Sequence, residues 1–502
     1  PETSSMQKWV NSDPGEYLPR PQSPERQKSL KSPWKAASGE RKPEEAGGST
    51  MSGVLMKSVS GIRGIVGESF TPELLAQAGA AFAMYCKHGT VVVGRDSRPT
   101  GEALAMNLIS ILVLNGCNVI DLGIVPTPTV QVMVEELGAA GGIVMSASHN
   151  PVEWNALKLI NASGRFLNSA DIAKYFKLME KPVSYRKWNR IGRIDKMLNA
   201  ATVHIDLVMS AVNVNIIKKK KFHVVIDSVN GAGSFITPAM LELLNCRVTE
   251  INCTPDGLFP RGAEPLPENL KQLSDAVKKH GADIGFAQDP DADRLAIVDE
   301  NGNPLGEEYT VTLVSDHLLS KEKGTVVVNL STTKAVEDVA ARHGVPFYRA
   351  RVGEINVVDE MLKKGARTGG EGNGGVISPE IHYGRDSLAG IAYILEMMAL
   401  RNKKISQLKE DMPLYFMKKG KVVLKNPSVS AELLKRIQID YSDEKISILD
   451  GLRIDFKKDG PFKNGWVHLR SSNTEPVFRI IAESGSSSTT EKIYSHFAGI
   501  IR

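Results

Sequence analysis

Short apolar runs alternate with longer amphipathic stretches from Lys57 onward, and this alternation constrains the fold more than any other sequence feature. Residues 90–96 and 141–148 are apolar runs that end in polar residues, and residues 102–114 carry apolar side chains at helical spacing. Strands that alternate with helices indicate βαβ units, in which helices cover a parallel sheet. The sequence therefore predicts an α/β protein.

The alternation restarts twice along the chain. Residues 221–233 read as a strand that runs into a glycine turn, and residues 324–333 open a third unit. Between them, residues 282–294 read as a strand that ends in acids, and residues 295–302 read as the return strand of a hairpin. The last stretch shows antiparallel-looking strands and a closing helix over 489–500. We expect three similar α/β units followed by a smaller α+β unit.

The first 50 residues differ in composition from the rest. They hold seven of the 26 prolines and very few large aliphatic side chains, so they bury too little apolar surface to offset the entropy of ordering. The segment is predicted to be disordered. Because it begins without methionine while Met51 precedes the first regular pattern, a mis-called start or a fusion remnant is one interpretation. The more specific alternative is that residues 1–50 form a regulatory or binding tail.

Composition excludes several classes of protein. The formal net charge of +5 over 502 residues is too weak and too spread to indicate nucleic-acid or membrane binding. No apolar stretch approaches the ~18–20 residues of a membrane span, and no signal peptide is evident. The four cysteines lack the spacing of a metal or disulfide framework, which is typical of reduced thiols in a cytoplasmic protein.

A serine loop and an acid cluster both follow strands that read as buried. Ser148 lies in Ser-Ala-Ser-His-Asn-Pro (146–151), at the kind of strand end where open α/β sheets bind ligands. A serine hydroxyl needs an activating partner, or must already carry the group to be transferred. Asp289, Asp291 and Asp293 alternate in a strand-end loop, so three carboxylates can converge on one hard cation such as Mg²⁺. Read alone, each segment could equally be a polar or acidic turn.

Two further loops offer groups for a sugar phosphate. Residues 470–476 place Arg470, three hydroxyls and an amide on one tight loop, which suits a phosphate clamp. Residues 369–375 are glycine-rich, with Glu371 and Asn373 as the functional side chains, and they suit sugar hydroxyls better than an anion. This glycine-rich loop lacks the Gly-Lys-Ser/Thr of a nucleotide site. A polar turn and a flexible turn are the structural alternatives.

The four loops together, in this order, resemble the α-D-phosphohexomutase superfamily across residues of about 55–500. That superfamily includes phosphoglucomutases, phosphomannomutases and phosphoglucosamine mutases. The resemblance implies three similar α/β domains with mixed sheets and a C-terminal α+β domain, arranged around a central active-site cleft. The implied domains are a phosphoserine domain, a Mg²⁺-loop domain, a sugar-loop domain and a phosphate-loop domain, over residues 51–205, 206–308, 309–414 and 415–502.

The resemblance also implies roles for individual residues. Phosphorylated Ser148 would carry the phosphoryl group, and one of its oxygens would join three aspartates around one Mg²⁺ ion. Lys158 would have a pKa lowered by neighbouring cations and act as a general base. The implied catalytic residues are Ser148, His149, Lys158 and Arg294; the implied metal ligands are Ser148, Asp289, Asp291 and Asp293; the implied substrate-binding residues are Arg63, Glu371, Asn373, Arg470, Ser472, Asn473 and Thr474.

The implied reaction exchanges the 6-phosphate and 1-phosphate of a hexose through a bisphosphorylated sugar, which also serves as activator. The 371–375 loop, residues 382–390 and the Ser-Gly-Ile-Arg-Gly opening favour glucosamine phosphate as substrate. Asn473 in the clamp also suits phosphomannomutase/phosphoglucomutase enzymes, and Glu354 stands where some relatives carry a histidine. A non-catalytic sugar-phosphate binder, a phosphatase and a sugar kinase are alternatives from other classes. The expected assembly is a monomer or a homodimer.

Overall fold

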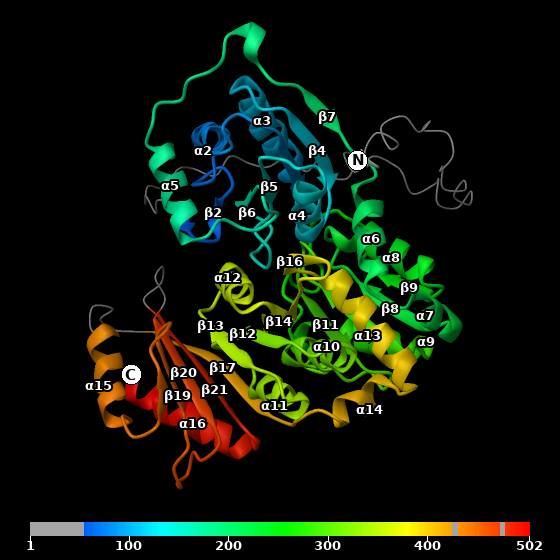
Figure 1. Cartoon of the computed structure of the whole chain (residues 1–502), viewed down its shortest axis with the longest axis vertical. Helices are drawn as coiled ribbons and strands as arrows, with labels where there is room; N and C mark the ends of the chain where they lie inside the picture. Colours follow the sequence, from blue (N-terminus) through cyan, green and yellow to red (C-terminus); the bar gives the residue numbers. More distant parts are fainter. Residues whose placement is uncertain (1–54, 424–429, 472–476, 502) are drawn as a thin grey trace, which may run out of the picture. The chain divides into compact units, whose positions relative to one another are not determined.

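The computed structural model describes residues 55–423, 430–471 and 477–501. Four sheets succeed one another along this part of the chain (Figure 1). Three are mixed parallel and antiparallel sheets with helices, and the fourth is antiparallel. The predicted fold class is therefore confirmed. Residues 1–50 lie outside the described residues, so the disorder expected there stays a prediction, as do the exact domain boundaries.

The first sheet has seven strands in the order β1-β2-β6-β5-β3-β4-β7. Its parallel part is β5, β3, β4 and β7, and β6, β2 and β1 extend it as antiparallel strands. The strands are β1 (Met56–Ser58), β2 (Gly61–Ile65), β3 (Val91–Arg95), β4 (Val119–Ile124), β5 (Gly141–Met145), β6 (Trp154–Asn161) and β7 (Ile194–Lys196), and the helices are α2 (Pro72–Tyr85), α3 (Gly101–Leu114), α4 (Thr127–Glu136) and α5 (Ser169–Met179).

The two faces of this sheet enter two different hydrophobic clusters. In β3, Val91 and Val93 pack with residues of α2, α3 and α5, whereas Val92 packs with residues of α4. This alternation is the period of two that a strand imposes on its side chains. The helix predicted over 102–114 is α3, which begins one residue earlier.

The second sheet has the order β11-β10-β8-β9. The return strand predicted after the acid cluster is confirmed, because β11 pairs antiparallel with β10. The strands are β8 (His223–Asp227), β9 (Arg247–Ile251), β10 (Ile284–Gln288) and β11 (Leu295–Val298), and the helices are α6 (Ala200–Ser210), α7 (Val214–Lys220), α8 (Gly233–Leu243) and α9 (Lys271–His280).

The third sheet has the order β13-β12-β14-β15-β16 and ends in an antiparallel β14-β15-β16 meander. Buried residues of the second and third sheets, such as Phe286 and Val328, belong to one hydrophobic cluster. The strands are β12 (Thr325–Asn329), β13 (Phe347–Ala350), β14 (Ala366–Glu371), β15 (Gly375–Ser378) and β16 (His382–Arg385), and the helices are α10 (Glu308–Lys321), α11 (Lys334–His343), α12 (Glu354–Lys364), α13 (Ser387–Arg401) and α14 (Ile405–Glu410).

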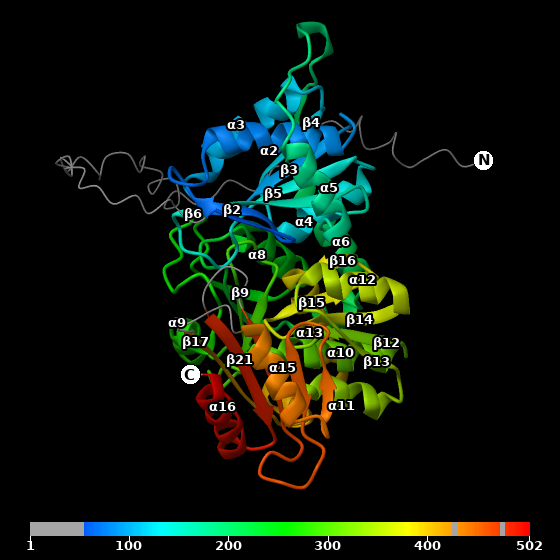
Figure 2. The same ribbon diagram turned by 90° about the vertical axis from the view of Figure 1, so that its left-hand side faces the viewer.

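The fourth sheet is antiparallel throughout, in the order β17-β21-β20-β19-β18. Figure 2 shows two of its strands, β17 and β21, together with the helices α15 and α16. Residues of α15 and α16 pack in its hydrophobic cluster, as expected for an α+β unit. The strands are β17 (Phe416–Val423), β18 (Lys445–Ser447), β19 (Leu452–Asp455), β20 (Trp466–Ser471) and β21 (Val477–Ser484), and the helices are α15 (Ser430–Asp440) and α16 (Ser487–Ile501).

The described helices and cysteines bear on two expectations from the sequence, the lack of a membrane span and the presence of free thiols. None of these helices is long and apolar enough to cross a membrane alone; α6 and α7, bent by 94° at their break, meet that test only as a pair and only by length and composition. The four cysteines are free, and three of them are buried, as the spacing predicted.

Candidate active site

The loop after β5 holds Ser148 in an unusual backbone conformation. Ser148 has φ of +49°, a left-handed conformation that costs a non-glycine residue about 1–3 kcal/mol. Its backbone N–H donates to Ser146 Oγ at 3.0 Å, and its carbonyl accepts from Arg98 Nη2 at 2.6 Å. Because strained residues persist where the surroundings over-determine them, this serine loop is a candidate functional feature on geometry alone.

Arg98 organises the whole serine loop. Only 1% of its surface is exposed, and its guanidinium donates to the carbonyls of Ser148, Asn150 and Pro151 at 2.6–2.9 Å. Asp96 pairs with Arg98 Nε at 3.1 Å and accepts from Ser146 Oγ at 2.6 Å. The carbonyl groups that Arg98 binds lie 50 to 53 residues away in the sequence.

The predicted acid cluster forms a compact, buried group. Asp289, Asp291 and Asp293 follow β10, are fully buried, and offer carboxylate oxygens that all lie within 4.8 Å of one another. Ser148 Oγ donates to Asp289 Oδ2 at 2.9 Å, although 141 residues separate the two. The serine loop and the aspartate loop therefore form one site.

The free oxygens of this cluster fit a divalent cation. Asp291 Oδ1 and Asp293 Oδ1 are buried and accept no hydrogen bond. Burial, followed by the charges of Asp293 and Asp291, raises the pKa of Asp289 well above its usual range. Oxygen donors without histidine or cysteine suit a hard ion such as Mg²⁺, and a divalent charge would relieve the mutual repulsion.

Lys158, for which the resemblance implied a general-base role, lies inside the acid cluster. Its Nζ, carried by β6, is 2.5 Å from Asp291 Oδ2 and 3.6 Å from Asp293 Oδ2. The expected direction of its pKa shift is wrong. Burial lowers the pKa of Lys158, but the carboxylates of Asp291 and Asp293 outweigh burial and raise that pKa above its usual value. The nearest charges are anions rather than the expected cations, and they hold Lys158 as an ammonium.

His149 is held neutral beside Ser148. Its Nδ1 accepts from Arg294 Nη2 at 3.1 Å and lies 3.4 Å from Ser148 Oγ. Burial, together with the charge of Arg294 and other cations, lowers the pKa of His149 to about 2. Arg294 in turn donates to Glu264 Oε1 at 2.7 Å. Arg63, another predicted site residue, donates from Nη1 to Asn150 Oδ1 within the serine loop.

The glycine-rich loop is joined to the aspartate loop by a residue that the sequence did not single out. Glu371, at the end of β14, accepts from Asn329 Nδ2 at 2.8 Å, from the Gly353 N–H at 3.0 Å and from Arg385 Nη1 at 2.9 Å. Arg385 also donates to Asp293 Oδ2 at 2.6 Å and to Glu354 Oε2 at 3.0 Å. Its place at the end of β16 was the available sequence signal.

Glu354 and Asn373 flank this junction. Burial raises the pKa of Glu354 to about 7, although the charge of Arg385 lowers it. Asn373 is half-buried, and its Oδ1 accepts from the Gly375 N–H at 3.3 Å. The structure therefore connects the serine, aspartate and glycine-rich loops through direct polar contacts.

The predicted phosphate clamp is described only in part. Arg470 lies on β20, is half-buried, and donates from Nε to Asp450 Oδ1 at 2.9 Å. The remaining predicted members, Ser472, Asn473 and Thr474, lie outside the described residues. Their role stays a prediction.

Sequence and fold both match known proteins. Family models described as phosphoglucomutase/phosphomannomutase, alpha/beta/alpha domains I, II and III, match residues 55–186, 202–302 and 306–415. A phosphoglucomutase/phosphomannomutase of Thermococcus kodakarensis is 39% identical over 434 residues, covering 85% of this chain and 94% of that protein. A probable phosphoglucosamine mutase of Methanopyrus kandleri is 34% identical, covering 88% of this chain and 97% of that protein.

A solved structure gives the same fold. The crystal structure of a phosphoglucomutase/phosphomannomutase family protein from Burkholderia thailandensis aligns with a TM-score of 0.77 at 24% identity, covering 89% of this chain and 97% of that one. Because the similarity extends over most of the chain and includes all three α/β units, this chain belongs to the α-D-phosphohexomutase superfamily and is an enzyme that transfers phosphate within its substrate.

Proposed function

We propose that this enzyme interconverts glucosamine 6-phosphate and glucosamine 1-phosphate, with phosphorylated Ser148 as the phosphoryl carrier. The contact between Ser148 Oγ and Asp289 Oδ2, 2.9 Å apart in a buried three-carboxylate cluster, carries the proposal. Thr127 also donates its hydroxyl to this cluster, at Asp291, but of these two residues Ser148 is the one in a strained, tightly held loop.

The aspartates and the serine have complementary roles in this proposal. Asp289, Asp291, Asp293 and a phosphoserine oxygen would hold Mg²⁺, which when bound offsets negative charge on the phosphoryl group and on the leaving oxygen. The free carboxylate oxygens of Asp291 and Asp293 support this assignment. The burial of the aspartates and of Ser148 keeps water away from a phosphoserine that would otherwise hydrolyse.

Transfer then proceeds in two balanced steps. The free sugar hydroxyl attacks the phosphorus of phosphorylated Ser148; a P–O bond to the sugar forms and the P–O bond to Ser148 Oγ breaks. Lys158 gives a proton to Ser148 Oγ, and the proton that the sugar hydroxyl loses replaces it on Lys158. The bisphosphorylated sugar then turns over. In the second step Ser148 Oγ attacks the other phosphate and loses its proton, so the isomeric monophosphate is released and phosphoserine is regenerated. A hexose bisphosphate would charge an unphosphorylated enzyme by the same second step.

Three residues near Ser148 are suited to moving protons and charge. Lys158, held as an ammonium by Asp291 and Asp293, can give a proton to the departing Ser148 oxygen in the first step. In the second step the direction is reversed, and Lys158 acts as a base toward Ser148 Oγ. Arg294 contributes fixed positive charge beside Asp289 and Asp293, 3.9 Å from each. His149 stays neutral and orients Arg294.

Sugar and distal phosphate would be held by the other loops. We assign Glu371 and Asn373 to the sugar hydroxyls, and Arg63 to the substrate near the serine loop. Arg470 with Ser472, Asn473 and Thr474 would bind the phosphate that is not reacting. Glu371 already accepts three protein hydrogen bonds, so it would be a rigid acceptor, one that arrives in its binding geometry without reorganisation.

The identity of the sugar rests on narrower support. The loop over 371–375 and residues 382–390 favour glucosamine phosphate, and several relatives are named probable phosphoglucosamine mutases. The alternative is phosphomannomutase/phosphoglucomutase activity, the name of the Thermococcus kodakarensis relative. Asn473 supports this alternative, because many bacterial phosphoglucosamine mutases have glycine at that place in the clamp.

A coupled assay separates these substrates. The 6-phosphates of glucosamine, mannose and glucose would each be supplied with Mg²⁺ and a trace of hexose bisphosphate, and kcat/KM would be compared. We expect the highest kcat/KM for glucosamine 6-phosphate; a higher value for mannose or glucose 6-phosphate contradicts the sugar assignment. Release of inorganic phosphate without isomerisation would indicate a phosphatase.

Ser148→Ala tests the carrier role directly. The variant should lose essentially all turnover while keeping its thermal midpoint, because Ser148 is anchored through its backbone by Ser146 and Arg98. Incubating wild type with labelled bisphosphate should leave label on Ser148. A fully active Ser148→Ala variant would overturn the mechanism.

A further inference from the structure

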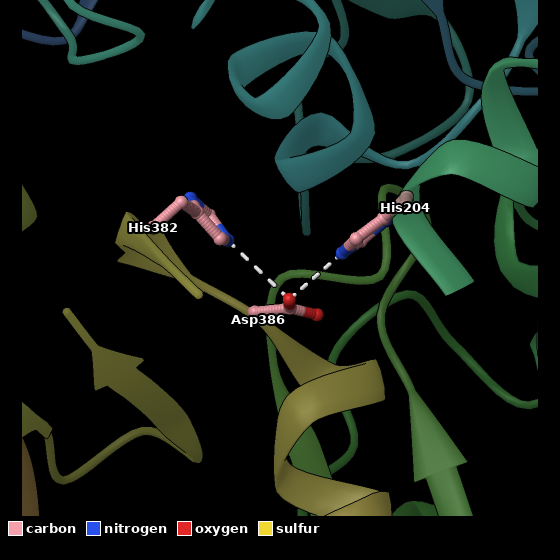
Figure 3. Close-up of side chains that lie close together, drawn as sticks. All are labelled: His204, His382 and Asp386. Carbon is pink, nitrogen blue, oxygen red and sulfur yellow. Dashed lines mark hydrogen bonds and ion pairs between the residues drawn. The ribbon is translucent and has the colours of Figure 1, made fainter. Parts of the chain in front are cut away.

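A second cluster of ligand-type side chains lies apart from the acid cluster. His204 comes from the middle of α6, His382 begins β16, and Asp386 is the N-cap residue of α13. Figure 3 shows both imidazole rings directed at the Asp386 carboxylate from opposite sides. One ligand atom from each of the three residues lies within 4.8 Å of the other two, which is close enough for one ion to bind all three.

The cluster is buried, and its two histidines differ in their hydrogen bonding. His204, His382 and Asp386 are 0%, 3% and 1% exposed. His204 Nε2 lies 2.9 Å from Asp386 Oδ2, a normal hydrogen bond. His382 Nε2 lies 3.3 Å from the same oxygen without hydrogen-bond geometry, and both nitrogens of His382 lack a hydrogen-bond partner. Apart from this ion-pair contact with Asp386, His382 has no partner, and a poorly satisfied buried imidazole is costly, so a further partner is indicated.

The surrounding contacts orient the free atoms toward the centre of the cluster. Asp386 Oδ1 caps α13 by accepting from the N–H groups of Leu388 and Ala389, at 2.8 and 3.3 Å, which leaves Oδ2 for the two histidines. His204 Nδ1 lies 2.9 Å from Thr129 Oγ1, a contact that directs Nε2 at the carboxylate. A histidine that binds metal through one nitrogen usually has its other nitrogen fixed in this way.

We propose that His204, His382 and Asp386 form a second metal site, for one Zn²⁺ or a similar borderline transition-metal ion. Two imidazole nitrogens and one carboxylate oxygen are typical ligands for such ions, whereas Mg²⁺ prefers oxygen alone. The ion would supply the partner that His382 lacks. This site is independent of the proposed mutase chemistry and of the aspartate cluster.

The position of the site indicates a structural role. The ion would link α6 to β16 and to the start of α13, three segments separated by up to 182 residues. Helix α4 touches both sites, since Thr127 contacts Asp291 and Thr129 contacts His204. Residue 385, next to Asp386, reaches the aspartate cluster in the other direction. Binding would therefore hold together the elements that carry the catalytic loops.

Cobalt is a suitable probe, because Co²⁺ takes zinc sites and absorbs visible light. The full chain would be stripped with a chelator, supplied with excess Mg²⁺ to fill the aspartate cluster, and titrated with Co²⁺ alone. We expect one equivalent to bind with the intense bands of a low-coordinate nitrogen-containing site, and Zn²⁺ to abolish those bands. Weak bands of all-oxygen, octahedral Co²⁺, or no bands, would overturn the proposal.

Two variants show whether the named residues bind the ion. His382→Asn removes a ligand that makes no hydrogen bond, so we expect a folded protein whose Kd for Co²⁺ rises by about 100-fold or more. His343→Asn is the matched control, because His343 pairs with Asp316 at 2.8 Å but, among the described residues, no second histidine joins that pair in a possible metal site. Zn²⁺ should raise the thermal midpoint of wild type and His343→Asn, and not of His382→Asn.

Equal Co²⁺ binding by His382→Asn and wild type would refute the assignment. If His382→Asn does not fold, His204→Gln replaces it, and the wild-type spectrum still decides the coordination. Mutase activity with Mg²⁺ is measured separately. A result against the second metal site would therefore not contradict the proposed function, and a result against the proposed function would not contradict the metal site.

Discussion

Replacing Arg385 by methionine should destabilise the protein more than any surface arginine change. The guanidinium is 8% exposed and contacts Asp293, Glu371 and Glu354 at 2.6, 2.9 and 3.0 Å. Methionine keeps the apolar stem and removes the charge. Three buried carboxylates would then share the site with Lys158 and Arg294, which lie 3.6 and 3.9 Å from Asp293.

The size of the effect follows from these contacts. Removing one partner of a buried ion pair costs about 3–5 kcal/mol, because the other charge stays buried and uncompensated. The three contacts do not add, since Glu354, with a pKa that burial raises to about 7, can take up a proton near neutral pH at small cost. We therefore expect Arg385→Met to lower the free energy of unfolding by about 3–5 kcal/mol.

Urea unfolding at pH 7, followed by tryptophan fluorescence, measures this change. Arg367→Met is the matched control, because Arg367 also pairs with two glutamates, Glu322 at 3.2 Å and Glu380 at 2.7 Å, but these are more exposed. Exposed pairs contribute about 0–1 kcal/mol. Adding Glu371→Gln to Arg385→Met should restore part of the loss, since it removes an orphaned carboxylate whose pKa is lowered and which would otherwise stay ionised.

The activity assay adds a second readout. Arg385 positions Asp293 and Glu371, so its loss should lower kcat/KM by about 100-fold even where the variant stays folded. If Arg385→Met loses no more stability than Arg367→Met, the reasoning that the buried carboxylates depend on Arg385 is wrong. No gain from the second substitution would lead to the same conclusion.

Three further predictions test other parts of the molecule. Burial raises the pKa of Glu308 to about 7 despite Lys419, so its ionised form is disfavoured in the folded state, and the free energy of unfolding should fall as pH rises from about 4.5 to 7. The free energy of unfolding of Glu308→Gln should therefore rise by about 2–3 kcal/mol relative to that of wild type between pH 5 and 8. Parallel plots of this free energy against pH for the two proteins would contradict the prediction. Asp291→Asn should raise the Mg²⁺ concentration for half-maximal activity by about tenfold or more, with EDTA abolishing wild-type turnover; an unchanged Mg²⁺ requirement would exclude Asp291 as a ligand. Lys158→Arg keeps the charge beside the aspartates, so the thermal midpoint should hold while kcat falls by about 10²–10⁴, and retained kcat would rule out proton transfer by Lys158.

Local pattern was sufficient to predict the elements that carry the site. The apolar run of β3, the helical spacing in α3 and the hairpin after the acid cluster are set by neighbours in sequence, and each was predicted within a few residues. Ser148 and the three aspartates could also be chosen from sequence, because strand ends concentrate polar groups where ligands bind.

The mixed edges of the sheets were harder to predict. Strands β6 and β16 carry Lys158 and Arg385, yet neither stood out as a strand in the chain's alternation. Antiparallel additions to a parallel sheet depend on which distant segment pairs with the edge, as β2 does with β6. Such pairing leaves little trace in the sequence of either strand.

The sequence by itself determined which residue types stand at the strand ends, and so the chemistry available: a serine, three aspartates, a glutamate and several arginines. Only the tertiary structure decided how they are charged. Lys158 was expected to have a lowered pKa, but Asp291, 133 residues away, lies 2.5 Å from it and raises that pKa. Charge interactions depend on distance in space and on burial, and neither can be read from spacing along the chain.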